Sequence, residues 1–253
     1  MRLGWNKIWP PLVAVICLLG LWQLCTSLFE IEKWILPSPI DIIREASAQS
    51  SGLWEHTLAT VELTGVGFII GTSVGLIIAV VLHLIPFLKS ALYPLLILSQ
   101  NIPTIALAPL LMIWFGFGLL PKIVVITLVC FFPVAVAMMG GLRQTDRMML
   151  NYMHMIGASK RQIFIKLELP HALPSLFSGI KIAATYSVMG AVIAEWIGSD
   201  KGIGYYMMLQ KASYRTDRMF IAISIIVVLS LIMFAIIALI EKWLVRWNRQ
   251  QQS

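Results

Sequence analysis

Few residues with enzymatic chemistry occur together in this sequence. Gly71-Thr72-Ser73-Val74-Gly75 has the G-x-S-x-G spacing of serine hydrolases, whose serine needs a strand-to-helix turn and a nearby base. Ser73 instead stands in the middle of a long apolar run. Gly67, Gly71 and Gly75 recur every four residues, which places them on one helix face that a neighbouring backbone can approach closely. We expect these glycines to serve helix packing.

The sequence also offers no metal site or nucleotide site of its own. The histidines at positions 56, 83, 154 and 171 are scattered and form no H-E-x-x-H motif. The cysteines at positions 17, 25 and 130 lie in apolar stretches without C-x-x-C spacing, so we expect them to be packing residues. A GxxxxGK[ST] motif is absent as well. If ATP drives this protein, another subunit must bind it.

Polar residues interrupt the apolar stretch between Lys89 and Lys122. Proline frees a backbone carbonyl that polar side chains or water must satisfy, and such broken helices are tolerated where they line protein or a wet cavity. Two interpretations stay open, a translocation path or mere repair of the kinked helix. The residues in question are Ser99, Gln100, Asn101 and Thr104, with prolines at 94, 103 and 109.

Two ionisable residues fall in another apolar stretch, 173–197. Lys181 and Glu195 are fourteen positions apart, or roughly 21 Å along a helix, so they cannot touch within one straight helix. Lys181 is close enough to the membrane surface to snorkel. Glu195 lies one turn from the other end, and intramembrane acids are candidates for function. We expect Glu195 to be a gate or anchor on the translocation path, with simple exposure at the interface as the alternative.

The composition defines the elements that must position these residues. Apolar residues make up 59% of the 253 positions and charged residues only 12%, with a mean hydropathy of +0.86. Soluble domains carry about 25% charged residues, so a soluble enzyme and a disordered chain are both excluded. The net charge of +7 comes mainly from short segments between apolar runs, where bases orient helices and do not indicate nucleic acid. We predict an integral membrane protein in contact with lipid.

Six apolar stretches are long enough to cross a bilayer. The first holds 22 residues without charge, is too long for a signal-peptide core and has no cleavage site after it, so we expect a retained span. The prediction is an all-α, polytopic membrane protein of one domain, 1–253. Its spans are predicted at about 8–29, 63–88, 91–116, 123–142, 173–197 and 219–240.

An even number of spans places both termini on the same side of the membrane. With the termini inside, the inner segments hold more Lys and Arg than the outer ones, eleven against seven. The positive-inside rule then predicts cytoplasmic termini in a multi-pass protein. Ser38, Pro39 and Asp41 match the start of a short helix on the outer surface. The inner connection, 143–172, is the only cytoplasmic segment large enough for docking.

Within this inner connection, Gly157-Ala158-Ser159 precedes a basic amphipathic stretch that ends at Leu169-Pro170. We expect two short helices meeting at an angle. Here the chain resembles the permease subunits of bacterial binding-protein-dependent ABC importers, whose cytoplasmic signature is EAA, three residues, Gly, nine residues, an aliphatic residue, any residue and Leu-Pro. Nine residues separate Gly157 from Leu167, and Leu169-Pro170 completes the pattern. The chain departs from it at Asn151-Tyr152-Met153, which stands in place of EAA.

Other motifs resemble the nitrate, sulfonate and taurine branch of these permeases. They are Leu36-Pro37-Ser38-Pro39, the segment 54–71, the segment 108–116 and Ala194-Glu195-Trp196-Ile197-Gly198. The segment 117–122 is more similar to permeases for thiamine-type pyrimidine precursors. The resemblance covers nearly the whole chain.

The resemblance implies a type I ABC importer permease in the bacterial inner membrane that moves a small polar solute. Its implied partners are a second copy of the chain, two cytoplasmic ATPase subunits that carry ATP and Mg, and an extracytoplasmic solute-binding protein. It also implies a segment in contact with the ATPase, which we predict at Tyr152, Met155, Gly157, Ala158, Ser159, Leu169 and Pro170. The predicted translocation path comprises Gln100, Asn101, Thr104 and Glu195. The solute implied is a pyrimidine precursor, or alternatively a sulfonate, taurine or nitrate.

Other functions compete with this interpretation. An ion-coupled secondary transporter or channel would show inverted repeats and intramembrane charge pairs, and the sequence displays neither. A membrane-embedded enzyme needs paired catalytic groups at one depth, and Ser73 has no evident partner. The inner connection could also be an ordinary amphipathic segment lying on anionic lipid.

Overall fold

The computed structural model describes residues 5–48 and 50–245, and within these ranges every regular element is a helix. This confirms the predicted all-α fold class. In chain order the elements are α1 (Trp5–Leu28), α2 (Pro39–Ala48), α3 (Ser50–Leu84), α4 (Pro86–Ser99), α5 (Thr104–Phe115), α6 (Leu119–Arg143), α7 (Arg147–Met155), α8 (Lys160–Ile163), the π-helical segment η1 (Phe164–Glu168), α9 (Leu169–Gly198), α10 (Ile203–Ala212) and α11 (Thr216–Leu244).

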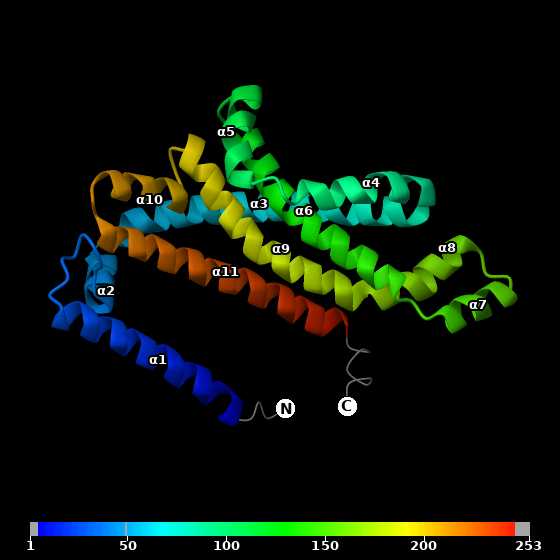
Figure 1. The fold of residues 1–253 in the computed structure, drawn as a ribbon, viewed down its shortest axis with the longest axis horizontal. Coiled ribbons are helices and arrows are strands. Elements are labelled where there is room, and N and C mark those ends of the chain that lie inside the picture. The colour runs from blue at the N-terminus through cyan, green and yellow to red at the C-terminus, as the bar shows by residue number, and fades with distance from the viewer. Residues whose placement is uncertain (1–4, 49, 246–253) are drawn as a thin grey trace.

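Five of the described helical segments are long and apolar enough to cross a membrane, and α4 and α5 together add a bent sixth. The predicted span 91–116, in which we expect the prolines to break the helix, corresponds to this pair, and α4 and α5 meet at 101° across residues 100–103. Pro103 explains the break, since proline cannot donate its share of the helical hydrogen bonds and disfavours helix in the residue before it. In Figure 1, α5 rises away from the common direction of the long helices.

The second predicted span, 63–88, also has different ends. Helix α3 begins at Ser50 and ends at Leu84, and Ile85 is extended because Pro86 follows it. The charged residues Glu55 and Glu62 lie on this helix, so the charge-free run marked only its apolar part.

Helices α3, α6 and α9 form the packed core of the molecule. A Cβ added at Gly71 would lie 2.7 Å from Cys130, and one at Gly75 would lie 2.5 Å from the carbonyl oxygen of Phe131 on α6. Gly67 faces Ile126 in the same way. The three glycines therefore let the α3 and α6 backbones approach more closely than any larger residue would permit. Met138 and Ala183 are fully buried in this core.

Helix α9 continues without interruption from α8 and η1, so that a helical rod runs from Lys160 to Gly198. The predicted end of a short helix at Pro170 is therefore wrong. Pro170 follows η1 directly, and the π-helical hydrogen bonding there, in which the Leu169 N–H bonds to the Phe164 carbonyl, accommodates the missing N–H of Pro170 within the rod. His83 at the end of α3 contacts Glu168 of η1, with Nε2 and Oε2 3.0 Å apart.

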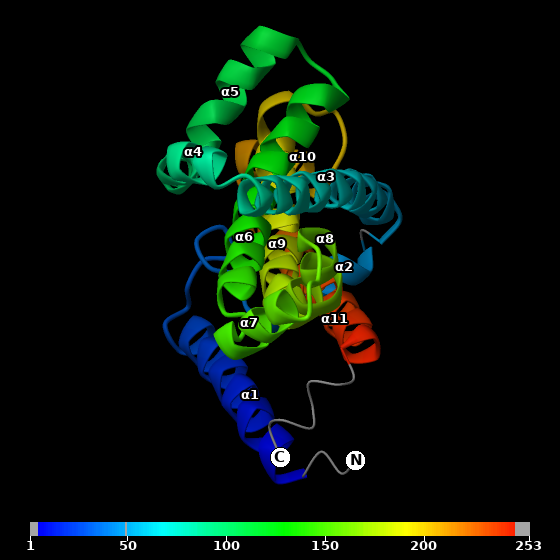
Figure 2. The same ribbon diagram turned by 90° about the vertical axis from the view of Figure 1, so that its right-hand side faces the viewer.

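The ends of the long helices differ in what they carry. One end, here called the α10 end, carries α2 and α10, and the opposite α7 end carries α7 and α8 (Figure 1). Viewed from the α7 end, α7 and α8 lie in front of the core helices (Figure 2). The first residues of α1 and the last residues of α11 both lie away from the α10 end (Figure 1). Arg2, Arg246 and Arg249, which the topology prediction counted, lie outside the described residues.

Helix α2 begins as the sequence predicted. The Ser38 hydroxyl accepts a hydrogen bond from the Asp41 N–H at 3.2 Å and donates one to the Asp41 carboxylate at 2.8 Å. A hydrogen bond from Lys33 lowers the pKa of Asp41, which keeps the Asp41 carboxylate ionised. By contrast, α1 packs mainly through its end near α2, where Trp22 meets Phe220 of α11 at 5.4 Å between ring centroids. Most apolar side chains of α1 are exposed, as expected for a lipid-facing helix.

Candidate functional site

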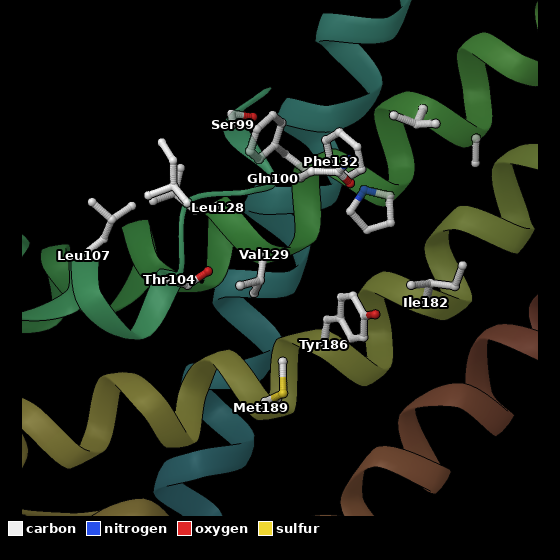
Figure 3. A pocket seen from close by; sticks show the side chains of 15 residues that line it. Ser99, Gln100, Thr104, Leu107, Leu128, Val129, Phe132, Ile182, Tyr186 and Met189 are labelled. Carbon is white, nitrogen blue, oxygen red and sulfur yellow. The ribbon is translucent and has the colours of Figure 1, made fainter. Parts of the chain in front are cut away.

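A cavity of about 650 Å³ lies between the α4–α5 break and helices α6 and α9. Ser99, Gln100 and Thr104 reach it from the break, and Ile182, Tyr186 and Met189 face it from α9 (Figure 3). The α6 wall is apolar and includes Phe131 and Phe132. A change of direction at the α4–α5 break thus brings polar groups and backbone of a membrane-spanning segment to the side of a cavity, the setting in which irregular backbone is tolerated.

The polar residues of the break divide into two roles. The Ser99 hydroxyl donates to the Leu96 carbonyl at 2.7 Å, and the Asn101 amide donates to the Ile97 carbonyl at 3.3 Å. These bonds satisfy carbonyls at the end of α4, as repair of an interrupted helix requires. Gln100 and Thr104 are the predicted path residues that line the cavity, whereas Asn101 does not line it.

The cavity lining carries no carboxylate, ammonium, guanidinium or imidazole among the described residues. Lys181 precedes the lining residue Ile182, but its ammonium pairs with Glu241 of α11 at 2.8 Å. The predicted snorkelling of Lys181 is thereby replaced by an ion pair between the middle of α9 and the last turn of α11. Within the described ranges no three His, Cys, Asp or Glu residues group to hold a metal ion.

Glu195 lies in a different place from the cavity. Its side chain is only 2% exposed, so the alternative of simple interfacial exposure is wrong. The carboxylate accepts hydrogen bonds from the Thr60 hydroxyl at 2.8 Å and from the Gly204 N–H at 2.7 Å. The structure therefore does not bring Glu195 together with Gln100 and Thr104. Close contacts with α3 and the loop before α10 take it out of solvent.

Helix α7 has the opposite character, because none of its described residues is buried. Asp146 caps it by accepting from the Met148 N–H at 2.7 Å. Met148, Tyr152 and Met155 are spaced at i, i+4 and i+7, which places them on one helix face, and each is more than half exposed. An apolar stripe of this kind on a short helix is typical of a helix that docks in a groove of a partner.

The residues after α7 form a turn and a second cap. Gly157 has φ +76°, in the left-handed region that favours glycine, and the Ala158 N–H bonds to the Met153 carbonyl at 3.0 Å. Ser159 forms a capping box with Gln162 at the start of α8. Leu169 and Pro170 lie beyond η1, and Leu169 packs on the core. The structure thus places these two apart from the exposed stripe on α7.

Several residues of these sites were missed by the sequence predictions. Met148 could have been found, since it shares the i, i+4, i+7 spacing with Tyr152 and Met155. The cavity residues Phe132 and Tyr186 could not, because in an apolar span nothing in the sequence distinguishes an aromatic side chain facing a cavity from one facing lipid. Thr60 and Gly204 were also missed, since their partner Glu195 is distant in the chain.

The chain matches known proteins over most of its length. The family described as "Binding-protein-dependent transport system inner membrane component" matches residues 71–246. A probable ABC transporter permease of Haemophilus influenzae is 37% identical over 90% of this chain and 93% of its own. The formylaminopyrimidine transport permease of Halalkalibacterium halodurans is 32% identical over 95% and 96%. A riboflavin transport system permease of Chloroflexus aurantiacus is 34% identical over 95% and 91%.

The fold is also that of a solved transporter. An inward-facing structure of the MetNI methionine ABC transporter aligns with a TM-score of 0.64 and 22% identity, over 82% of this chain and 97% of its own. This similarity supports a type I ABC importer permease fold. ATP hydrolysis in such transporters takes place on a separate subunit, in agreement with the missing P-loop. The chain belongs to the family of inner membrane components of binding-protein-dependent transport systems, as a permease subunit.

Proposed function

We propose that this permease moves a small, uncharged, polar heterocyclic solute that an extracytoplasmic binding protein delivers. A thiamine-type pyrimidine precursor is the first candidate. The observation that carries the proposal is the chemistry of the cavity, whose described lining offers amide, hydroxyl and aromatic groups and no fixed charge.

The alternative solutes, sulfonates, taurine and nitrate, all carry a negatively charged group. Moving an ion into an apolar cavity costs far more free energy than moving a neutral polar group, unless a cation pairs with it. The nearest lysine in sequence, Lys181, is already paired with Glu241. Gln100 and Thr104 can exchange hydrogen bonds with neutral ring heteroatoms, and Phe132 and Tyr186 add aromatic surface. The relatives named for formylaminopyrimidine and riboflavin support the same choice.

The proposed assembly contains two copies of this chain, two cytoplasmic ATPase subunits and one binding protein. In this assembly the α7 end and both termini face the cytoplasm, and the ATPase binds α7. The exposed stripe of Met148, Tyr152 and Met155 supports this role, as does the turn at Gly157 and Ala158 that orients α7 against α8. Ser159 acts by capping α8.

The test of the solute is uptake into liposomes that contain the permease and its ATPase, with the binding protein outside. We expect ATP-dependent accumulation of a radiolabelled aminopyrimidine and none of taurine. Gln100→Ala should lower that uptake, whereas Ser90→Ala, at an exposed residue of α4 that does not line the cavity, should leave it near the wild-type rate. Preferential uptake of taurine would overturn the choice of solute. Uptake driven by an ion gradient without the ATPase would overturn the ABC mechanism.

The test of orientation and coupling uses single cysteines on a background without Cys17, Cys25 and Cys130. A membrane-impermeant thiol reagent should label Met155→Cys only from the cytoplasmic side. Gly157→Leu should uncouple ATP hydrolysis from uptake, since a side chain at φ +76° is strained and disturbs the turn. Labelling of Met155→Cys from outside, or unchanged coupling in Gly157→Leu, would contradict the proposed role of α7.

A further inference from the structure

A buried cluster of hydrogen bonds lies at the α10 end, around Glu195. Both carboxylate oxygens are used, one by the Thr60 hydroxyl of α3 and the other by the backbone N–H of Gly204 in α10. Thr60 is fully buried, and Glu195 is almost so. A buried carboxylate with two good hydrogen bonds fixes its partners, because separating them would leave polar groups unpaired in an apolar environment.

The same cluster holds three consecutive N–H groups at the start of α10. Besides Gly204, the Ile203 N–H donates to the Thr60 hydroxyl oxygen at 2.8 Å and the Gly202 N–H donates to Nδ1 of His56 at 3.2 Å. The first N–H groups of a helix have no partner within it. Here α3 and α9 supply those partners, so α10 is fastened to both core helices by its own N-terminal turn.

Two glycines make this close approach possible. A Cβ at Gly202 would overlap the Glu195 carboxylate, and one at Gly204 would lie 2.5 Å from the Val192 carbonyl oxygen. Gly202 also has φ +112°, a conformation that L side chains rarely adopt. The fastening therefore depends on residues from three segments of the chain, namely Thr60, Glu195 and the turn 202–204.

Glu195 stands near the far end of the helical rod that begins at α8. The rod comprises 39 residues, or roughly 58 Å at about 1.5 Å per residue. Its other end adjoins α7, the segment that we assign to the ATPase. A continuous packed helix passes a displacement at one end to the other, and Glu195 is the point where that displacement can reach α10 and α3.

We infer that Glu195 is a positioning residue that fastens α10 to this rod, so that movement at the α7 end is passed to the outer face and the docked binding protein is sensed by the ATPase. The inference rests on the proposed function for its partners, but the fastening itself is a property of this chain. Exposed side chains of Met208, Leu209 and Lys211 on α10 leave that helix available to the binding protein.

The first arm of the test measures the fastening alone, by hydrogen exchange of residues 199–206 in the assembled complex. Thr60→Val removes the hydroxyl that bridges Glu195 and Ile203, and exchange there should accelerate about tenfold or more. Thr60→Ser keeps the hydroxyl and should retain the wild-type protection of these amides from exchange. Thr57→Val is the matched control, because the Thr57 hydroxyl bonds only within α3, to the Leu53 carbonyl, in the described structure. Unchanged exchange in Thr60→Val would overturn the fastening.

The second arm compares basal ATPase activity with the activity in the presence of loaded binding protein. Glu195→Ala and Thr60→Val should keep the basal rate and lose most of the stimulation, whereas Thr60→Ser should retain it. Stimulation that survives in variants with accelerated exchange would overturn the transmission role. If the wild-type complex shows no stimulation and no ATP-driven uptake, the proposed function fails and the transmission role with it, while the exchange result still decides the fastening. If Glu195→Ala does not assemble, the Thr60 pair decides both points.

Discussion

The core of this permease and its α7 segment use the same kind of residue in opposite ways. Met138 on α6 is fully buried among α3, α6 and α9, whereas Met148 on α7 is 78% exposed. The core is complete within one chain, since glycines bring its helices into contact and apolar side chains fill the space between them. The apolar stripe on α7 is not buried by any other part of its own chain in the described structure. The first region determines the fold, and we propose that the second acts by binding a partner.

The largest expected effect comes from making the same substitution in both regions. Met138→Ala should lower the free energy of unfolding by about 2 kcal/mol, because the packing contacts of a buried methionine are lost and a cavity remains. This loss lies at the low end of the usual range. Lipid solvates an apolar side chain about as well as the protein core does, so mainly packing contacts are lost. Thermal unfolding in detergent measures this loss.

Met148→Ala is the matched variant on α7. It should leave the unfolding temperature near that of the wild type and reduce association with the ATPase, measured by co-purification. Equal destabilisation by the two variants would contradict the distinction between a self-contained core and a partner-dependent α7.

An intermediate effect tests how the core is closed. Gly75→Ala introduces a methyl group that would lie 3.0 Å from the Phe131 Cα and closer still to its carbonyl oxygen, so the helices must separate. We expect a loss of about 1.5 kcal/mol, within the range typical of overpacking. Gly65→Ala on the same helix has no atom within 4 Å of the added carbon and should be neutral or slightly stabilising. A stable Gly75→Ala variant would show that α3 and α6 do not need this contact.

The smallest expected effect concerns the junction between α7 and the rod. Ser159→Ala removes a helix cap and should cost about 1 kcal/mol locally, seen as faster hydrogen exchange over residues 160–163. Ser159→Asn retains a capping side chain and should preserve both protection and transport. If Ser159→Asn preserves protection but abolishes transport, Ser159 contacts the ATPase directly and its role is more than a cap.

The sequence predicted the helical class well, because the cost of exposing backbone to lipid leaves few alternatives for long apolar runs. It predicted the helix boundaries less well. Charge-free runs mark the apolar part of a span, so Glu55 and Glu62 were excluded from the helix that contains them. The prolines between Lys89 and Lys122 indicated an irregular span, but proline tells where a helix is weakened and not how far it turns.

The candidate sites show the same division. The glycine repeat and the turn at Gly157 follow from local rules of spacing and backbone conformation, so their geometry could be predicted. The environment of Glu195 could not be. It depends on Thr60, which is 135 positions away, and on the turn 202–204, and pairings at that separation leave no periodic pattern in one sequence.

The sequence alone determined that this chain lies in a membrane, that it is helical and that it carries no P-loop motif, since each depends on composition or on a contiguous motif. The tertiary structure decided which polar groups face a cavity, that Lys181 is neutralised by Glu241, and that Glu195 holds α10. These outcomes depend on which helix faces meet, and that is settled by the packing of the whole chain.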